Sequence, residues 1–242
     1  MQKIELQHDE LDFRSREAFK NLRTNIEFSG DDVKVICITS CTPNEGKSNI
    51  SFELAKSYAQ LGKRVLLLDA DLRKSVMRQR HRRGKVRWGM SNYLVGKADF
   101  EDVLCATDVR NLYMVFSGPV PPNPSELLNN KRFHQMIDDA RMDYDMVIID
   151  TPPLGSVIDT AVVSKCCDGA VIVISSGVIS YRFVRKVKEQ LETANCRILG
   201  CVLNKVSMGG KGYYGKYYGK YYGKYYGKYY GKYYGNYGNY GE

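Results

Sequence analysis

The loop Ser40-Cys-Thr-Pro-Asn-Glu-Gly-Lys-Ser48 has the residue types that bind a chain of phosphates. It lies between an expected strand and an expected helix, where backbone N–H groups and the helix dipole favour anions. Lys47 is placed to reach the β- and γ-phosphates, and the Ser48 hydroxyl to bind Mg²⁺. Cys41 replaces the first glycine of the usual pattern, while Asn44 suits a left-handed backbone. The predicted nucleotide contacts of this loop are Pro43, Asn44, Glu45, Gly46, Lys47, Ser48 and Asn49.

Three aspartates end two further apolar runs, Leu66-Leu-Leu-Asp69-Ala-Asp71 and Val147-Ile-Ile-Asp150. The carboxyl ends of parallel strands form the edge at which α/β sheets bind ligands. A strand-ending aspartate is more often a turn or helix N-cap residue, but three that converge on one phosphate loop argue for a functional site. Together they supply what phosphoryl transfer needs, a metal-held triphosphate and a carboxylate that accepts a hydroxyl proton.

The C-terminal segment repeats Tyr-Tyr-Gly-Lys almost without interruption. Its frequent glycines disfavour both helix and strand, so we expect a flexible, solvated arm over residues 209–242, after a globular domain over residues 1–208. A self-associating low-complexity segment is the alternative. Beside a nucleotide site, the hydroxyls suggest phosphoryl transfer to tyrosine. The candidate phosphoacceptors are Tyr213, Tyr214, Tyr217, Tyr218, Tyr221, Tyr222, Tyr225, Tyr226, Tyr229, Tyr230, Tyr233, Tyr234, Tyr237 and Tyr240.

Strands and helices must alternate to position these residues, which predicts an α/β fold with a doubly wound, mostly parallel sheet of the P-loop NTPase type. Continuous apolar runs indicate strands that are covered on both faces. The expected strands are Val33–Thr39, Arg64–Asp69, Leu112–Phe116, Met146–Asp150, Ala170–Ser175 and Ile198–Asn204. The expected helices are Leu11–Glu27, Lys47–Leu61, Met90–Val95, Phe100–Cys105, Pro124–Met142, Thr160–Cys167 and Arg182–Ala194.

Composition narrows the setting of the protein. The net charge of +9 is concentrated in the lysine-containing tail, so charge alone does not identify a partner. Seven cysteines are scattered without metal-like spacing, which is typical of a reducing compartment. The polar N-terminus is not a signal peptide, and no apolar run approaches the roughly 18 residues that span a bilayer. We therefore expect a cytoplasmic protein.

Taken together, the Gly-Lys-Ser loop, Asp69-Ala-Asp71-Leu-Arg73, Ile149-Asp150-Thr-Pro-Pro and the tyrosine cluster resemble the bacterial tyrosine kinases (BY-kinases), most closely the stand-alone CpsD type of capsular and exopolysaccharide synthesis. The resemblance runs from about Glu17 to the C-terminus. It implies ATP and Mg²⁺ as cofactors and autophosphorylation of the tail, in trans. By the same resemblance the catalytic residues are Lys47, Asp69, Asp71 and Asp150, the metal ligands are Ser48, Asp69 and Asp150, and Asn204 lies near the base.

The resemblance also implies partners. Glu17, Lys20 and Arg23 resemble an oligomerisation motif of the family, with Lys20 in place of an arginine, which suggests a ring-like homo-oligomer. Charge pairs along one exposed helix are the alternative. A membrane-bound activator, the polysaccharide co-polymerase, would recruit the protein to the inner face of the membrane through its cytosolic segment. A cognate tyrosine phosphatase and other substrate proteins complete the implied partners.

Two other classes of function compete with this interpretation. A partitioning ATPase of the ParA/MinD kind carries a signature lysine where this chain has Thr42, which argues against that class. A nucleic-acid-binding protein could use the lysine-interleaved tyrosines for stacking, but this leaves the three aspartates unexplained. Arg73 could contact phosphate or a neighbouring subunit, or be an ordinary surface arginine.

Overall fold

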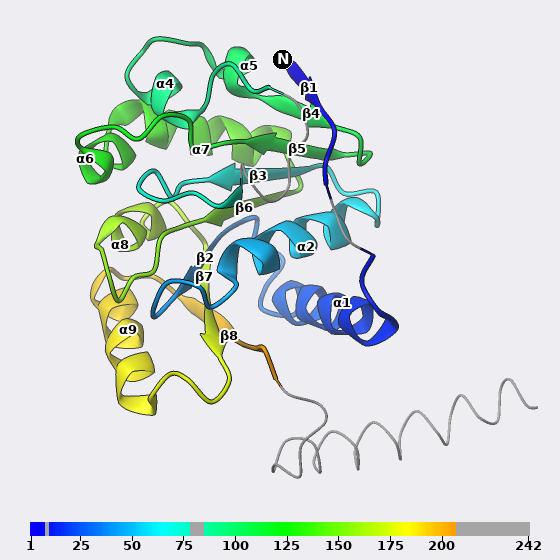
Figure 1. Ribbon diagram of the computed structural model, residues 1–242, viewed down its shortest axis with the longest axis vertical. Helices are drawn as coiled ribbons and strands as arrows, with labels where there is room; N and C mark the ends of the chain where they lie inside the picture. Colours follow the sequence, from blue (N-terminus) through cyan, green and yellow to red (C-terminus); the bar gives the residue numbers. More distant parts are fainter. Residues whose placement is uncertain (8–9, 78–84, 207–242) are drawn as a thin grey trace, which may run out of the picture. The chain divides into compact units, whose positions relative to one another are not determined.

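An eight-stranded sheet forms the centre of the described part of the chain, residues 1–7, 10–77 and 85–206 of a computed structural model (Figure 1). The strand order is β1-β4-β5-β3-β6-β2-β7-β8. All neighbouring pairs are parallel except β4 with β5, which confirms the predicted mostly parallel α/β sheet. The strands are β1 Gln2–Ile4, β2 Val35–Ser40, β3 Val65–Asp69, β4 Cys105–Thr107, β5 Leu112–Val115, β6 Met146–Asp150, β7 Gly169–Ser175 and β8 Ile198–Asn204.

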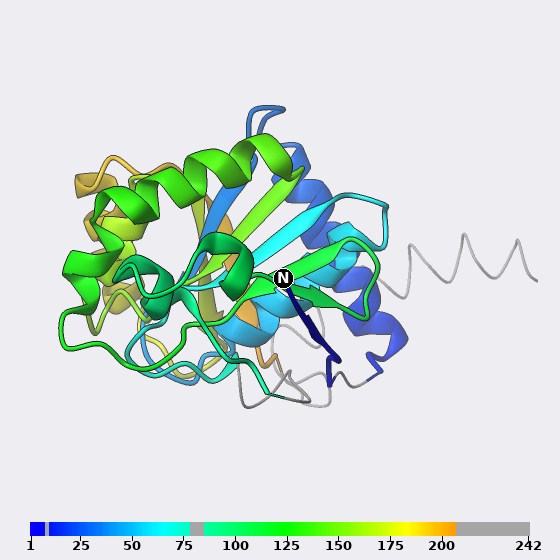
Figure 2. The same ribbon diagram turned by 90° about the horizontal axis from the view of Figure 1, so that it is seen from above.

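Helices cover both faces of the sheet, as Figure 2 shows from above. On one face, α1 and α2 pack against the sheet, and on the other lie α4 to α9. The central strands β2, β3 and β6 are buried along their whole length, as their continuous apolar runs predict. The helices are α1 Phe13–Glu27, α2 Lys47–Ala59, α4 Met90–Leu94, α5 Phe100–Val103, α6 Pro124–Leu128, α7 Lys131–Asp143, α8 Asp159–Ser164 and α9 Tyr181–Thr193.

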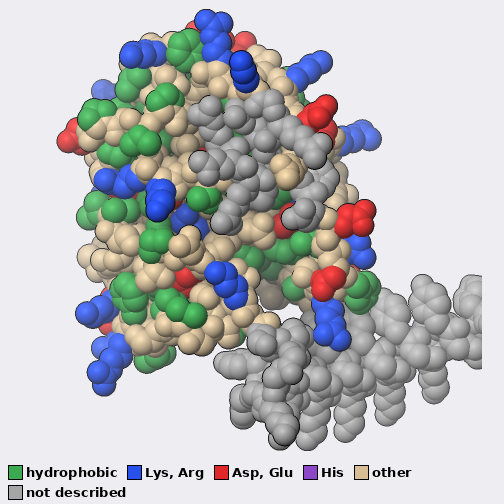
Figure 3. Space-filling model, viewed as in Figure 1, with side chains coloured by type: hydrophobic (Ala, Val, Ile, Leu, Met, Phe, Trp, Pro, Cys, Tyr) green, Lys and Arg blue, Asp and Glu red, His purple; other side chains and the backbone are tan. Residues whose placement is uncertain are grey.

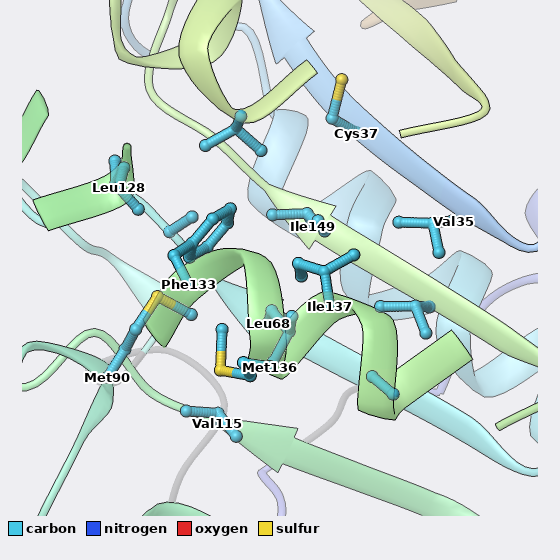
Figure 4. Packing of buried hydrophobic residues seen from close by; sticks show 14 of the residues in the cluster. Val35, Cys37, Leu68, Met90, Val115, Leu128, Phe133, Met136, Ile137 and Ile149 are labelled. Atoms are coloured by element: carbon cyan, nitrogen blue, oxygen red, sulfur yellow. The ribbon is translucent and has the colours of Figure 1, made fainter. Parts of the chain in front are cut away.

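Helix α7 illustrates how alternate strand residues separate the two halves of the core. Its Phe133, Met136 and Ile137 pack against Leu68 of β3 and Ile149 of β6 (Figure 4). The residues between these on the same strands point to α2 on the opposite face. Burial on both faces leaves only the strand ends free for chemistry.

Three predictions about the elements were wrong, and one of them is the helix expected over Thr160–Cys167, which ends at Ser164. The expected single helix over Pro124–Met142 is two helices, because Asn129 and Asn130 interrupt it and the Asn130 side chain caps α7 by accepting a hydrogen bond from the Phe133 N–H at 2.9 Å. The helix expected over Phe100–Cys105 ends at Val103, and Cys105 begins β4. Strands β1 and β4, each three residues long, pair with each other at the sheet edge.

Figure 3 shows how charged side chains are distributed on one face of the molecule. On the face seen in Figure 3, the coloured lysine and arginine side chains are scattered among uncharged atoms rather than gathered in one patch. On this face, the described side chains do not form the continuous cationic groove that tracks a nucleic-acid backbone. Within the described ranges, no helix is both long and apolar enough to cross a membrane.

Candidate active site

The phosphate loop joins β2, which ends at Ser40, to α2, which begins at Lys47. Asn44 and Gly46 both adopt positive φ, 66° and 95°, so the left-handed backbone predicted at Asn44 is confirmed. A Cβ atom on Gly46 would lie 2.2 Å from Nδ2 of Asn204, so both φ and space require glycine there. The loop therefore presents backbone N–H groups at the start of a helix, as an anion site requires.

Glu45 is buried and holds this loop in shape. Its Oε1 accepts hydrogen bonds from the backbone N–H and the hydroxyl of Thr42, at 2.5 and 3.1 Å, while Oε2 accepts one from the Ser175 N–H at 2.7 Å. The Asn204 Nδ2 donates to the Glu45 carbonyl at 2.8 Å. Glu45 and Asn204 thus tie the loop to the ends of β7 and β8. Of the other predicted loop contacts, Pro43 and Asn49 are exposed.

The predicted carboxylates converge beside this loop. Asp69 of β3 and Asp150 of β6 are direct neighbours in the strand register, and both are almost completely buried. Asp71 follows two residues later, and its Oδ2 lies 3.4 Å from Nζ of Lys47. Lys47 Nζ also lies 3.4 Å from the Ser48 hydroxyl. The structure therefore brings together the four residues predicted to be catalytic.

The charges in this cluster shift one another's pKa values. Burial acts to lower the pKa of Lys47, but the negative charges of Asp150, Asp71 and then Asp69 outweigh it, so the pKa of the lysine rises above its ordinary value. Burial raises the pKa of Asp150, while Lys47 and hydrogen bonds from Ser48 and Ser51 oppose this effect. The lysine stays charged and compensates part of the negative charge of the site.

Asp69 has the most unusual environment of the three carboxylates. Complete burial, followed by the nearby charge of Asp150, raises its pKa to about 7. Its Oδ2 accepts hydrogen bonds from the Ser75 hydroxyl and, at 3.3 Å, from the Ser117 N–H. Its Oδ1 is buried and has no hydrogen-bond partner. A buried carboxylate with one free oxygen and a pKa near neutrality is suited to accept a proton.

Sequence reasoning missed several residues that support the site. Ser75 and Ser117 hold Asp69, and the Ser51 hydroxyl donates to Oδ1 of Asp150 at 3.1 Å. Gly155 lies where the loop after β6 meets the phosphate loop, and a Cβ there would be 2.2 Å from the Cys41 carbonyl oxygen. Serines and single glycines in loops give no pattern that separates them from ordinary turn residues.

The predicted oligomerisation residues take two different environments on α1. Glu17 and Lys20 form an exposed ion pair of 2.7 Å within the helix, which matches the alternative prediction of charge pairs along one face. Arg23 instead points at α2, where its Nη1 donates to the carbonyl and hydroxyl oxygens of Ser57 at 2.8 and 2.9 Å. The tail tyrosines from Tyr213 onward lie outside the described residues.

The geometry of a phosphate loop beside three carboxylates matches known proteins. A family model described as "AAA domain" matches residues 33–198. The chain is 46% identical, over 84% of its own length and 91% of the relative's, to a protein of Streptococcus agalactiae named tyrosine-protein kinase CpsD. This chain belongs to the bacterial tyrosine-protein kinases. The resemblance noted from the motifs is thereby confirmed.

Solved structures agree with this membership. The kinase domain of the Escherichia coli tyrosine kinase ETK matches this kinase with a TM-score of 0.73 and 33% identity, over 82% of this chain and 80% of that one. The septum site-determining protein MinD of Pyrococcus horikoshii matches with a TM-score of 0.60 over 70% and 69% of the two chains, at 23% identity. The MinD likeness shows the shared P-loop NTPase fold alone, and Thr42 still separates this kinase from the ParA/MinD class.

Proposed function

We propose that this kinase transfers the γ-phosphoryl group of ATP, with Mg²⁺, to tyrosines of its own C-terminal tail, one copy acting on another. The observation that carries the proposal is the buried cluster of Lys47, Asp69 and Asp150 on the phosphate loop and the two strands next to it. Phosphoryl transfer depends almost entirely on positioning and electrostatic stabilisation, and this cluster supplies both.

The residues of the site fit Mg-ATP. Asp69, Asp150 and the Ser48 hydroxyl offer the hard oxygen ligands that Mg²⁺ prefers. Within the described ranges no group of three or more Asp, Glu, His or Cys is arranged to hold a metal by itself. This agrees with the usual behaviour of Mg²⁺, which binds one or two carboxylates together with substrate phosphates and water. Bound Mg²⁺ would neutralise charge on the β- and γ-phosphates, and Lys47 would contact the same phosphates.

Asp69 is the carboxylate that we assign as the proton acceptor. Both oxygens of Asp71 are engaged, Oδ2 by Lys47 and Oδ1 by the Arg73 and Lys74 N–H groups at 3.3 and 2.9 Å. In Asp69 only Oδ2 accepts hydrogen bonds, so the buried Oδ1 keeps its acceptor capacity. The tyrosine oxygen would attack the γ-phosphorus as its proton passes to Oδ1 of Asp69, and ADP would leave. Because the metal-ligand and base roles of Asp69 compete for this one oxygen, we place Mg²⁺ on Ser48 and Asp150.

Family membership supports a wider setting for the reaction. We place the kinase in the cytoplasm, recruited to the inner membrane face by the cytosolic segment of a membrane-bound activator, as a ring-like oligomer that a tyrosine phosphatase resets and that regulates capsular or exopolysaccharide synthesis. Each phosphate adds about −1.5 to −2 to a lysine-rich tail, so several would reverse its charge and drive subunits apart. Identical sedimentation of phosphorylated and unphosphorylated protein would contradict this switch.

The deciding experiment measures phosphotyrosine after incubation with Mg-ATP and the activator segment. Wild type is compared with Lys47→Met and with a chain truncated after Met208. We expect phosphotyrosine in wild type, a loss of at least about a hundredfold in Lys47→Met, and none on the truncated chain. Undiminished phosphotyrosine in Lys47→Met would rule out the assignment.

A further inference from the structure

The Arg73 side chain joins three elements near the carboxyl ends of the strands. Its Nε and Nη2 donate to the two carboxylate oxygens of Asp159, at 2.7 and 3.0 Å, and Nη2 also donates to the Ser125 hydroxyl at 3.0 Å. Ser125 donates in turn to Oδ1 of Asp159 at 2.5 Å. Ser125 lies on α6 and Asp159 begins α8, two helices that lie next to each other in Figure 1.

The backbone of the same arginine belongs to the turn that holds Asp71. The N–H groups of Arg73 and Lys74 donate to Oδ1 of Asp71, and Oδ2 of Asp71 faces Lys47. One chain of contacts therefore leads from Asp159 through Arg73 to Asp71 and on to the phosphate loop.

Burial makes the contact between Arg73 and Asp159 more than a surface ion pair. The Asp159 side chain is completely buried, whereas that of Arg73 is 40% exposed. Burial acts to raise the pKa of Asp159, but the hydrogen bonds from Arg73 and Ser125 outweigh it and hold the pKa below its ordinary range. A buried charged carboxylate is costly without its partner, and a two-pronged guanidinium contact fixes orientation as well as distance.

We propose that Asp159 and Ser125 are positioning residues that orient Asp71 for phosphoryl transfer by holding the Arg73 guanidinium. This rests on the proposed function, because that function gives Asp71 its place in the site. Arg73 then acts within its own subunit, rather than on phosphate or a neighbouring copy. The chain of contacts also links the turn after β3 to the helix that follows Asp150, so the two loops that carry the acidic residues keep one arrangement.

The test compares full-length Asp159→Asn, Arg73→Lys and the double variant with wild type. The readouts are the maximal rate of tail phosphotyrosine formation and the KM for Mg-ATP. We expect each single variant to lower the maximal rate by about tenfold to a hundredfold, since small displacements of a reacting group have effects of that size. The KM for Mg-ATP should stay within about threefold of wild type. The double variant should be no slower than the slower single variant, because both changes break one contact.

Asp168→Asn is the matched control. Asp168 also pairs with an arginine, Arg141, at 2.7 Å, but it lies at the opposite end of the strands, where it accepts hydrogen bonds from the Lys34 and Val35 N–H groups. This variant should melt earlier than wild type and keep its maximal rate when assayed well below its melting temperature. Equal slowing by Asp168→Asn would show a general loss of stability and overturn the proposal.

Two further results would overturn it. Effects that multiply in the double variant would show that Arg73 and Asp159 act separately, and unchanged rates in both single variants would show that the contact is dispensable. If even wild type formed no phosphotyrosine, the proposed kinase function would be wrong, and rates could not test the positioning role. A crystal structure of Asp159→Asn would then decide, because we expect the Asp71 carboxylate to move away from Lys47, and an unmoved carboxylate would refute the positioning role.

Discussion

The carboxylate of Glu45 accepts a 2.7 Å hydrogen bond from the backbone N–H of Ser175, which ties the phosphate loop to the end of β7. The second oxygen of this carboxylate accepts hydrogen bonds from the N–H and hydroxyl groups of Thr42, at the start of the same loop. We predict that Glu45→Gln weakens Mg-ATP binding by about tenfold or more, because the new amide group would face one of these N–H donors. Titration calorimetry with Mg-ATP measures the effect.

Glu53→Gln is the control for this prediction. Glu53, like Glu45, is buried, but it lies within α2 and pairs with Lys56 at 3.0 Å. The structure records no hydrogen bond or ion pair from Glu53 to the described phosphate loop. It should lose stability while keeping its affinity for Mg-ATP. Equal loss of affinity in both variants would contradict a specific role of Glu45 in shaping the loop.

Gly155 provides a steric test of the same loop. Its absent side chain leaves room for the Cys41 carbonyl oxygen and the Phe183 ring, which would lie 2.2 and 2.7 Å from a Cβ atom. We expect Gly155→Ala to destabilise the protein by about 1–3 kcal/mol and to weaken nucleotide binding, because the Cys41 backbone cannot move without the loop. Thermal unfolding should show no comparable change for Gly200→Ala, since Gly200 has open space around it.

The pKa of Asp69 predicts how stability depends on pH. In the folded state the pKa is about 7, against an ordinary value of 3.8, so the folded protein binds the extra proton between these values. The stabilising effect of that proton is complete below pH 3.8 and is lost as pH rises through about 7. Relative to wild type without nucleotide, Asp69→Asn should therefore gain roughly 2–3 kcal/mol in unfolding free energy between pH 5 and pH 8.

Urea unfolding at the two pH values in EDTA measures this difference. Added Mg-ATP should reduce it, because bound cation compensates the carboxylate charge of wild type and not of the variant. A constant difference between the two proteins from pH 5 to pH 8 would show that Asp69 does not titrate in this range.

Substitutions of Arg23 and Lys20 should differ in how much they lower the stability of the isolated subunit. Arg23→Ala removes two hydrogen bonds to Ser57 and should cost about 1–2 kcal/mol of unfolding free energy. Lys20→Ala removes an exposed pair with Glu17 and should change stability by less than about 0.5 kcal/mol. Denaturant titration at low protein concentration measures both changes. A larger loss of unfolding free energy for Lys20→Ala than for Arg23→Ala would contradict the intrasubunit role of Arg23.

The elements that the sequence predicts best are the long, buried ones. The six expected strands are all present. Continuous apolar runs such as Met146–Asp150 are covered on both faces in the central strands, whereas β8 at the sheet edge is only partly buried. β1 and β4 are too short for any periodicity to show, and they depend on pairing between distant parts of the chain. The break at Asn129 and Asn130 reflects capping by a side chain, which outweighs the helical pattern around it.

The site was predictable where chemistry and strand ends coincide. Lys47, Asp69 and Asp150 follow from motif spacing and from the common edge of parallel strands. The sequence does not show that Glu45 points into the protein and shapes the loop, nor that Asp159 engages Arg73, because both depend on contacts between distant segments. Asn204 was assigned to the nucleotide base, and that role stays a prediction beside its observed contact with the loop.

The side-by-side ends of β3 and β6 have a consequence for the lifetime of the enzyme in a cell. Two carboxylates held together in the core repel each other, so we expect the protein without nucleotide to open locally more readily than the protein with Mg-ATP bound. Proteases act on opened chains, so degradation should follow nucleotide supply. Cells depleted of ATP would then degrade this kinase faster than cells with a normal ATP concentration. The amount of the kinase in a cell would therefore follow the ATP concentration without a dedicated sensor.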